Sequence, residues 1–397
     1  MSWKEEKISS FAEVITGGTP STVVKEYWEN GTIPWLNSGD LNKGIINEAS
    51  NSITELGLKS SSTRMMPPDS VLIALTGATT GLTALLKIDA CANQSVTGIL
   101  PSKKHHPKYL YYFFKTQRKK ILSKAWGGAQ PHINQKYVKD YLIPLPPLPD
   151  QIQIANILSK AETLIEQRKQ SIALLDEYLK STFLEMFGDP IKNSKKWGKK
   201  KLRDVCDKIQ DGTHFSPPIT EEGIPYITAK HVRENKIDFW SNPWFISQES
   251  HNEIYKRCSP VKGDVIYIKD GATTGYAAIN KYDFEFSMLS SIALLKVNKK
   301  ILTSEYLCWW LNNSSVKIQI LKRMSGGAIQ RLTLTKINDL PILLPPLPLQ
   351  TQFATIVTKT ETLKEEYKKS LAELEKMYGS LSQRAFKGEL RMEKEIK

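Results

Sequence analysis

The segment Leu145-Pro146-Pro147-Leu148-Pro149 recurs in the second half of the chain as Leu344-Pro345-Pro346-Leu347-Pro348. A long stretch follows each copy, residues 150–187 and 349–386, with no glycine or proline until Gly379. Such stretches favour an uninterrupted helix, because glycine and proline are the residues that most often interrupt one. The prolines before each stretch end the preceding strand. The sequence therefore predicts two long helices, one after each half of a duplicated chain.

Other motifs return in the same order in both halves. Gly77-Ala78-Thr79-Thr80-Gly81 is repeated identically as Gly271-Ala272-Thr273-Thr274-Gly275, each time after a strand-like apolar run. Upstream and downstream of these loops, further pairs match: Ile33-Pro34-Trp35-Leu36 with Ile224-Pro225-Tyr226-Ile227, and Gly127-Gly128-Ala129 with Gly326-Gly327-Ala328. A shared order of this length indicates an internal repeat.

Each half begins with a globular part and ends with its long helix. The globular parts mix short β-branched runs and turns with helices, among them Pro107–Ser123 and Ser304–Arg323. The fold class is therefore α+β, with two tandem mixed α/β domains each followed by a long helix. The expected boundaries are a first domain at 1–149, helix 150–187, linker 188–200, second domain 201–348 and helix 349–390.

The long helices carry mostly apolar residues at alternating steps of four and three, a spacing typical of a coiled coil, with Arg168, Thr182, Thr360 and Lys364 as imperfect positions. The first series is Ile154, Leu158, Ala161, Ile165, Arg168, Ile172, Leu175, Leu179, Thr182 and Met186. The second is Phe353, Val357, Thr360, Lys364, Tyr367, Leu371, Leu374, Tyr378, Leu381 and Ala385. Residues 188–200 reach at most about 43–47 Å, too short to run back along a helix of roughly 52 Å. An antiparallel coiled coil with pseudo-two-fold symmetry is expected, acting as a rod that separates the domains.

Basic residues gather at matching places in the two halves. The chain carries 55 Lys and Arg against 41 Asp and Glu, a net charge of +14 at pH 7. Residues 90–139 contain no acidic residue, and residues 286–338 contain only Glu305. A solvated surface normally mixes both signs of charge. Two basic stretches with almost no acidic residues therefore indicate surfaces that face a polyanion such as nucleic acid.

Several classes of protein are disfavoured by the sequence. It contains no nucleotide-binding or dinucleotide-binding glycine loop and no Asn/Asp-Pro-Pro-Tyr/Phe methyltransferase motif, so we expect no catalytic residue. Its cysteines, Cys91, Cys206, Cys258 and Cys308, are not spaced as zinc ligands, so we expect free thiols and no metal. A charged start and the lack of a long apolar run predict a cytoplasmic protein.

The repeated pattern resembles the type I restriction-modification specificity (S) subunit family. The motifs that carry the resemblance are Gly31–Trp35 with Gly223–Tyr226, Gly263–Val265, the Gly-Ala-Thr-Thr-Gly loops, and the Leu-Pro-Pro-Leu-Pro-x-Gln segments ending at Gln151 and Gln350. It covers about residues 1–390. Two departures are visible: Pro68-Asp69-Ser70 stands where Gly263-Asp264 does, and Leu349 replaces an expected acid.

The resemblance implies a DNA-binding subunit that is not catalytic by itself. Each globular part would be a target-recognition domain that reads one half of a bipartite duplex site, and the helices would be spacers that also bind methyltransferase subunits. The implied partners are double-stranded DNA, two adenine-N6 methyltransferase (M) subunits and motor-nuclease (R) subunits. S-adenosylmethionine, ATP and Mg²⁺ would belong to those partners, with no cofactor bound by this chain.

The candidate DNA-binding residues lie in the basic stretches and in the repeated loops. Lysine and arginine suit phosphate, and glutamine or arginine side chains can also read base edges. In the first half they are Thr79, Thr80, Lys115, Arg118, Lys119, Lys120, Lys124, Gln130 and His132. In the second half they are Thr273, Thr274, Lys317, Lys322, Arg323, Gln330 and Arg331. The threonine loops fit plain tight turns better than DNA contacts, and the polar loops could also be an ordinary surface.

Two other functions remain open at this point. One is an enzyme with its own unrecognised nuclease or methylase site, which activity of the purified chain would reveal. The other is a coiled-coil scaffold that reads no sequence, which specific, salt-dependent DNA binding would exclude. The aromatic residues of the two basic helices, such as Tyr109 and Trp310, fit core packing better than base stacking.

Overall fold

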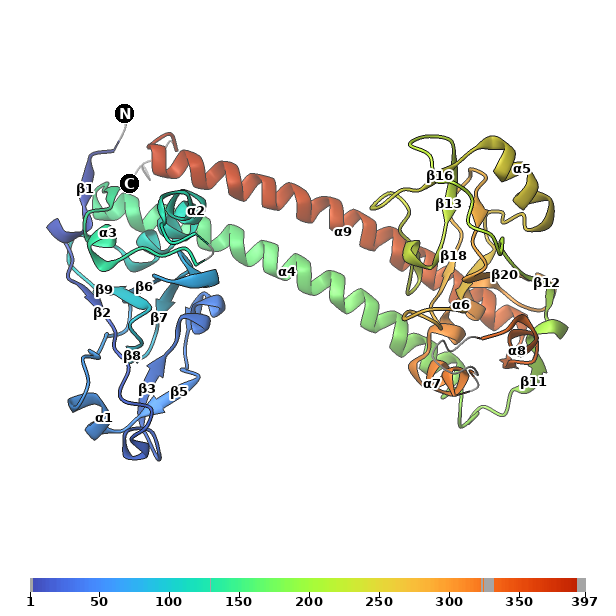
Figure 1. Cartoon of the computed structure of the whole chain (residues 1–397), viewed down its shortest axis with the longest axis horizontal. Coiled ribbons are helices and arrows are strands. Elements are labelled where there is room, and N and C mark those ends of the chain that lie inside the picture. Colours follow the sequence, from blue (N-terminus) through green and yellow to red (C-terminus); the bar gives the residue numbers. More distant parts are fainter. Residues whose placement is uncertain (1–2, 129, 323, 325–331, 391–397) are drawn as a thin grey trace, which may run out of the picture. The chain divides into compact units, whose positions relative to one another are not determined.

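The computed structural model describes residues 3–128, 130–322, 324 and 332–390 of the chain (Figure 1). The chain divides into two units, each with its own hydrophobic core. Unit 1 comprises Met1–Lys169 and Lys369–Lys397, and unit 2 comprises Gln170–Lys368. Helix α4 (Leu148–Phe187) and helix α9 (Leu347–Lys387) each begin in one unit and end in the other.

Unit 1 is built around a five-stranded mixed sheet with the order β2-β9-β6-β7-β4 (Figure 1). Its strands are β2 (Val14–Thr16), β4 (Ile45–Ile46), β6 (Val71–Ala74), β7 (Thr83–Leu86) and β9 (Val96–Ile99). A smaller sheet joins β3 (Ile33–Leu36), β5 (Asn51–Ile53) and β8 (Cys91–Ala92), while β1 (Glu5–Lys7) pairs with β10 (Leu142–Pro144). The helices are α1 (Glu55–Lys59), α2 (Pro107–Lys124) and α3 (Gln135–Lys139).

Unit 2 repeats this plan with a four-stranded antiparallel sheet of order β12-β20-β17-β18. These strands are β12 (Cys206–Asp211), β17 (Val265–Ile268), β18 (Ala277–Ile279) and β20 (Ile292–Val297). The smaller pairings use β11 (Gly198–Lys201) with β21 (Pro341–Leu344), β14 (Val232–Arg233) with β15 (Lys236–Ile237), and β13 (Ile224–Ile227) with β16 (Phe245–Ile246) and β19 (Ser287–Met288). The helices are α5 (Gln248–Arg257), α6 (Ser304–Asn312), α7 (Ser314–Leu321) and α8 (Leu334–Asn338).

The aromatic residues of the basic helices lie in the cores, as the sequence predicted. In unit 1, α2 packs on the main sheet and buries Tyr109, Phe113 and Phe114. In unit 2, α6 buries Tyr306 and Trp310 against the corresponding sheet. Each tyrosine hydroxyl is satisfied, since Tyr109 donates to the Pro144 carbonyl and Tyr306 to the Leu343 carbonyl. Base stacking by these rings is therefore excluded, because they are enclosed by protein.

The expected single helix over Ser304–Arg323 is wrong, because the structure has two helices there. Helix α6 ends at Asn312, and Asn313 adopts an extended backbone conformation with ψ of 127°. Its side chain then accepts hydrogen bonds from the Ser315 and Val316 amides and caps α7. Asparagine is among the best N-cap residues, so a local hydrogen bond replaces one turn of continuous helix.

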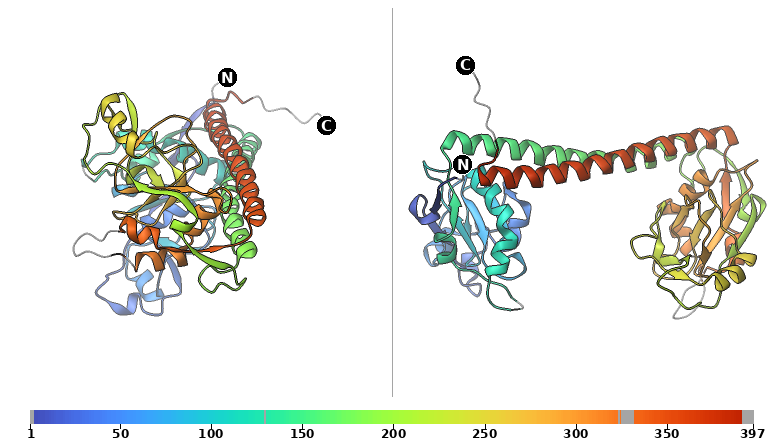
Figure 2. Two further views of the ribbon diagram at one scale, coloured as in Figure 1. Left: turned by 90° about the vertical axis from the view of Figure 1, so that its right-hand side faces the viewer. Right: turned by 90° about the horizontal axis from the view of Figure 1, so that it is seen from above.

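The two long helices are antiparallel within each unit (Figures 1 and 2). In unit 1 the first half of α4 lies beside the second half of α9, where Lys169 forms an ion pair with Glu375 at 3.0 Å. In unit 2 the second half of α4 lies beside the first half of α9, where Phe183 contacts Phe353. All of the predicted seam residues are buried or half-buried, from Ile154 to Met186 and from Phe353 to Ala385. The predicted fold class and antiparallel pairing are confirmed.

A buried glutamine fixes the start of each long helix. Gln151 accepts a hydrogen bond from the His106 amide and donates to the carbonyls of Lys104 and Pro146. Gln350 makes the equivalent three bonds in unit 2, to Thr303, Ile301 and Pro345. Both side chains are fully buried. The Leu-Pro-Pro-Leu-Pro-x-Gln segment therefore ties the long helix to the chain that enters α2 or α6.

Candidate nucleic-acid interface

In unit 1 the repeated loop Gly77–Gly81 is a tight turn held by its own threonines. Gly77 and Gly81 have φ angles of 71° and 74°, which glycine adopts without strain. The Thr79 hydroxyl donates to the Thr76 carbonyl, and the Thr80 hydroxyl to the Pro131 carbonyl at 2.6 Å. Because both hydroxyl protons are used inside the protein, these threonines shape the loop, and the structure favours the turn interpretation.

A second loop, Trp126–Ile133, packs on this turn. Trp126 and His132 exchange backbone hydrogen bonds and their rings meet edge to face at 4.9 Å. The Gly77 amide donates to the Pro131 carbonyl, which joins the two loops. Gln130 lies exposed at the tip of the second loop. The structure thus brings together two loops that are about fifty residues apart in the sequence, with an exposed amide side chain on the outside.

The basic residues of α2 divide between two roles. Arg118 donates to the carbonyls of Ala78 and Thr80 and so supports the Gly77–Gly81 turn. Lys119 and Lys124 are exposed, and Lys120 is exposed with its ammonium group 5.8 Å from the centre of the Tyr141 ring. These three lysines have ammonium groups that solvent, or a phosphate, can reach.

Lys115 differs from its neighbours on α2, because it contacts the long helix. Its ammonium group forms an ion pair with Glu162 of α4, which also accepts a hydrogen bond from Tyr112. Burial alone lowers the pKa of Lys115, but Glu162 and the Tyr111 hydroxyl more than offset it, so the pKa is raised. The structure therefore places this candidate, whose side chain is 42% exposed, against α4 with its charge paired.

The equivalent turn of unit 2, Gly271–Gly275, has the same form. Gly271 and Gly275 have φ angles of 100° and 97°, and the Thr274 hydroxyl donates to the Gly271 carbonyl at 2.6 Å. Lys317 takes the place of Arg118: its side chain packs over Gly275 and its ammonium group lies 3.5 Å from the centre of the Tyr276 ring. Thr273 is half-buried and Lys322 is exposed. The candidates Arg323, Gln330 and Arg331 lie outside the described residues.

Sequence reasoning missed a cluster of charges beside this turn. Asp211, at the end of β12, is 2% exposed and faces Lys269, Arg257 and His214. Lys269 is 7% exposed and also pairs with Asp270 at 3.1 Å. The sequence offered one sign of this cluster. The charged pair Lys269-Asp270 stands directly before Gly271, whereas the uncharged pair Leu75-Thr76 stands before the equivalent Gly77 in the first half.

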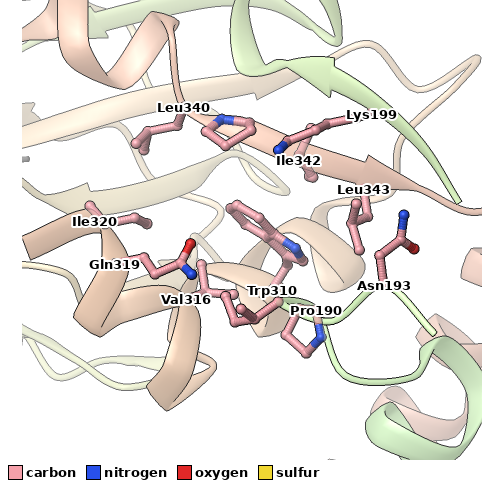
Figure 3. Close-up of a pocket in the computed structure, with 12 residues that line it drawn as sticks. Pro190, Asn193, Lys199, Trp310, Val316, Gln319, Ile320, Leu340, Ile342 and Leu343 are labelled. Carbon is pink, nitrogen blue, oxygen red and sulfur yellow. The ribbon is translucent and has the colours of Figure 1, made fainter. Parts of the chain in front are cut away.

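A pocket of about 120 Å³ lies elsewhere on unit 2, between α6, α7 and β21 (Figure 3). Trp310 and Leu340 line it, and the Trp310 indole N–H has no hydrogen-bond partner among the described residues. In unit 1 the position of Leu340 is held by the larger Tyr141. The two residues are equivalent because the Ile8 amide donates to the Tyr141 carbonyl in unit 1, and the Leu202 amide donates to the Leu340 carbonyl in unit 2. Residues of the segment 190–199, which precedes the second domain, also line the pocket.

Burial shifts the pKa of several titratable groups among the described residues toward their neutral forms. Burial raises the pKa of the Cys91 and Cys258 thiols to about 11, so both are protonated at neutral pH. Burial likewise lowers the pKa of His105 to about 4, with a smaller contribution from His106. Within the described ranges no three His, Cys, Asp or Glu side chains gather as a metal site requires. Nor does any helix there combine the length and apolarity of a membrane span.

Comparison with known proteins agrees with this duplicated architecture. The model of the family described as type I restriction modification DNA specificity domain matches residues 1–175 and again residues 194–376. The type I restriction enzyme MjaIX specificity subunit of Methanocaldococcus jannaschii is 28% identical, over 98% of this chain and 94% of its own length.

Two solved structures share the fold. The type I restriction-modification S subunit from M. genitalium superposes with a TM-score of 0.57 at 18% identity, over 99% of this chain and 97% of that one. A chain from a study of complex assembly and conformational transition in the type I restriction-modification system gives 0.58 at 19% identity, over 98% of both chains. With the family model matching both halves, this chain belongs to the type I restriction-modification DNA specificity domain family, with one copy of the domain in each half.

Proposed function

We propose that the chain is the specificity subunit of a type I restriction-modification complex and reads a bipartite site in duplex DNA. The observation that carries this proposal is the repeated pairing of a family-matched domain with a basic stretch of sequence that holds at most one acidic residue. Each unit would read one half of the site through the surface around its Gly-Ala-Thr-Thr-Gly turn. Phosphate contacts from exposed lysines would supply affinity, and side chains such as Gln130 would supply base recognition.

The chemistry would belong to partner subunits, because specificity subunits are the non-catalytic components of these complexes. Two adenine-N6 methyltransferase subunits would bring S-adenosylmethionine, and motor-nuclease subunits would bring ATP and Mg²⁺. The contribution of this chain is then to place a methyltransferase at one adenine in each half-site. Such a complex would act on DNA in the cytoplasm.

The test is to express the chain with its cognate methyltransferase subunits and to sequence the methylated bases of the host DNA. A two-part motif separated by unspecified bases is expected, and its loss on deletion of this chain alone. Methylation without sequence preference would overturn the proposal and favour a scaffold. Methylation or cleavage by the purified chain in the absence of any partner would instead favour an enzyme with its own site.

A further inference from the structure

The charged cluster of unit 2 is centred on one buried carboxylate, that of Asp211. Its Oδ1 atom lies 3.2 Å from Nη2 of Arg257, and its Oδ2 atom lies 3.3 Å from Nε2 of His214 and 3.5 Å from Nζ of Lys269. Asp211 and Lys269 are buried, whereas the side chains of Arg257 and His214 are 54% and 61% exposed. The buried Asp211 carboxylate therefore contacts two side chains, Arg257 and His214, that are themselves exposed at the surface.

The backbone around this cluster is shared with unit 1, where the charges are absent. Leu75 holds the position of Lys269: the Leu75 carbonyl accepts from the Ile133 amide at 2.9 Å, and the Lys269 carbonyl from the Leu332 amide at 3.1 Å. Leu75 is 5% exposed and lies in the apolar core. The same fold is thus built with leucine at this position, so the lysine is not needed to form it.

Thr16 holds the position of Asp211 in unit 1. Each is followed by a glycine that packs against a carbonyl group of the same fold. A Cβ atom at Gly17 would lie 2.1 Å from the Ala92 carbonyl oxygen, and a Cβ atom at Gly212 would lie 1.9 Å from that of Met288. The Thr16 hydroxyl forms a hydrogen bond with the hydroxyl of its cross-strand neighbour Thr97, at 2.9 Å. A neutral pair in one copy and a buried ion cluster in the other therefore occupy the same place.

A buried ion cluster is a poor source of stability. Removing charges from water costs free energy that their mutual attraction often only balances, and apolar replacements are frequently as stable. Unit 1 has such an apolar replacement at Leu75. The cluster of unit 2 is better explained by what it presents at the surface, which is a guanidinium group fixed by a carboxylate.

The cluster lies at the end of the sheet that carries the candidate loops. Asp211 is the last residue of β12, and Lys269 directly follows β17, with Asp270 between it and the Gly271–Gly275 turn. Arg257 is the last residue of α5. The buried pair of Asp211 with Lys269 therefore links the Arg257 guanidinium to the strand end that leads into this turn.

A carboxylate-fixed guanidinium has a defined use in DNA recognition. Arginine has five N–H donors in a rigid plane, so one nitrogen can bind Asp211 while donors remain free. Two such donors match the O6 and N7 acceptors of guanine in the major groove. We propose that Arg257 reads a guanine in the half-site recognised by unit 2, with Asp211 as its positioning residue. This inference rests on the proposed function.

The experiment measures base discrimination by the complex with its methyltransferase subunits. Duplexes carrying each single base-pair change in both half-sites are bound to the wild-type complex and to complexes with Arg257→Ala, Arg257→Lys or Asp211→Asn. In the wild type, one G·C pair of one half-site is preferred about tenfold or more. Arg257→Ala abolishes that preference alone, Arg257→Lys reduces it, and Asp211→Asn reduces it with Arg257 still present.

Two arginines provide matched controls. Arg203 of unit 2 is half-exposed and pairs with Asp339, away from the cluster, and Arg64 of unit 1 is half-exposed and pairs with Glu13. Their alanine variants remove the same charge and leave every base preference unchanged. If Arg257→Ala and Arg257→Lys both keep the full wild-type preferences, the inference is wrong. A wild-type complex without any base preference would instead overturn the proposed function itself.

Discussion

Thr80 and Thr274 occupy the same place in the two repeated turns, and both use the hydroxyl proton inside the fold. Their side chains are 0% and 4% exposed, so neither reaches a ligand. The motif that identifies the repeat most clearly is therefore a structural one. Gln130, which faces solvent in the adjacent loop, corresponds in sequence to Ile329 in the second half, as expected if this position determines different base sequences.

The exposed lysines of α2 should bind DNA phosphate without regard to sequence. Replacing Lys119 and Lys120 with alanine is expected to weaken binding to specific and nonspecific DNA and to reduce the slope of log affinity against log salt by about one to two units. The measurement is a salt titration of binding by the methyltransferase complex. Lys115→Met is the control: its charge is paired with Glu162, so the slope should stay near that of the wild type. An unchanged slope in the double variant would remove α2 from the interface.

The buried glutamines should be stability determinants of their own unit. Gln151→Leu leaves the His106 amide and the carbonyls of Lys104 and Pro146 without this partner, which should destabilise unit 1 by about 2–4 kcal/mol. Hydrogen–deuterium exchange should show faster exchange at the start of α2, with the start of α6 in unit 2 unchanged. Asn156→Leu, an exposed position on the same helix, is the control. Equal exchange at the start of α2 in both variants would show that the Gln151 hydrogen bonds do not hold this segment in place.

At the scale of helices and strands, the repeating apolar pattern of the long helices predicted their buried positions. Contacts between residues that are distant in the sequence could not be predicted in this way. The heptad positions of both long helices were predictable because their burial repeats along one helix, and the structure starts α4 and α9 at Leu148 and Leu347, two residues before the expected 150 and 349. The glutamine clamps were not predictable, since their partners lie up to 49 residues away in sequence. The break at Asn313 was missed because asparagine is tolerated inside helices as well as at caps.

At the candidate interface, too, the sequence could not predict contacts between residues that are distant along the chain. Composition located the basic stretches, but it could not separate Lys115, which pairs with a distant glutamate, from Lys119 one turn later. Nor could it find the Asp211 cluster, whose members come from β12, α5 and the residue after β17. Pairing between elements is decided by the tertiary fold, and no local pattern encodes it.

The pairing of α4 with α9 should stabilise unit 2 through Phe353. This side chain is fully buried and lies 5.5 and 5.4 Å, between ring centres, from Phe183 and Phe187 of α4. Phe353→Ala should destabilise unit 2 by about 3–5 kcal/mol through the lost burial and the cavity. Limited proteolysis should then cut within 170–368 well before the unit 1 sheet. Thr355→Ala, exposed on the same helix, should behave as wild type; resistance of the Phe353 variant would show that other contacts hold the helices.

At the scale of the whole molecule, the two units share a backbone plan and differ in side chains at matched places. Leu75 corresponds to Lys269 and Tyr141 to Leu340, and each change alters a surface or a pocket without altering the strands around it. A duplicated frame with independent surfaces is what a reader of two unrelated half-sites requires. The units should therefore be exchangeable one at a time.

That exchange is the most direct test of modularity, and the structure shows how to make it. Unit 1 includes the end of α9, where the Trp3 indole donates to the Ala385 carbonyl and Phe386 packs on Tyr109 and Phe113. Residues 1–145 should be replaced by the matching part of the Methanocaldococcus jannaschii relative, with Trp3, Tyr109 and Phe113 retained. Sequencing of the methylated bases is then expected to show one half of the motif changed and the other kept. A motif altered in both halves would mean that the units do not read DNA independently.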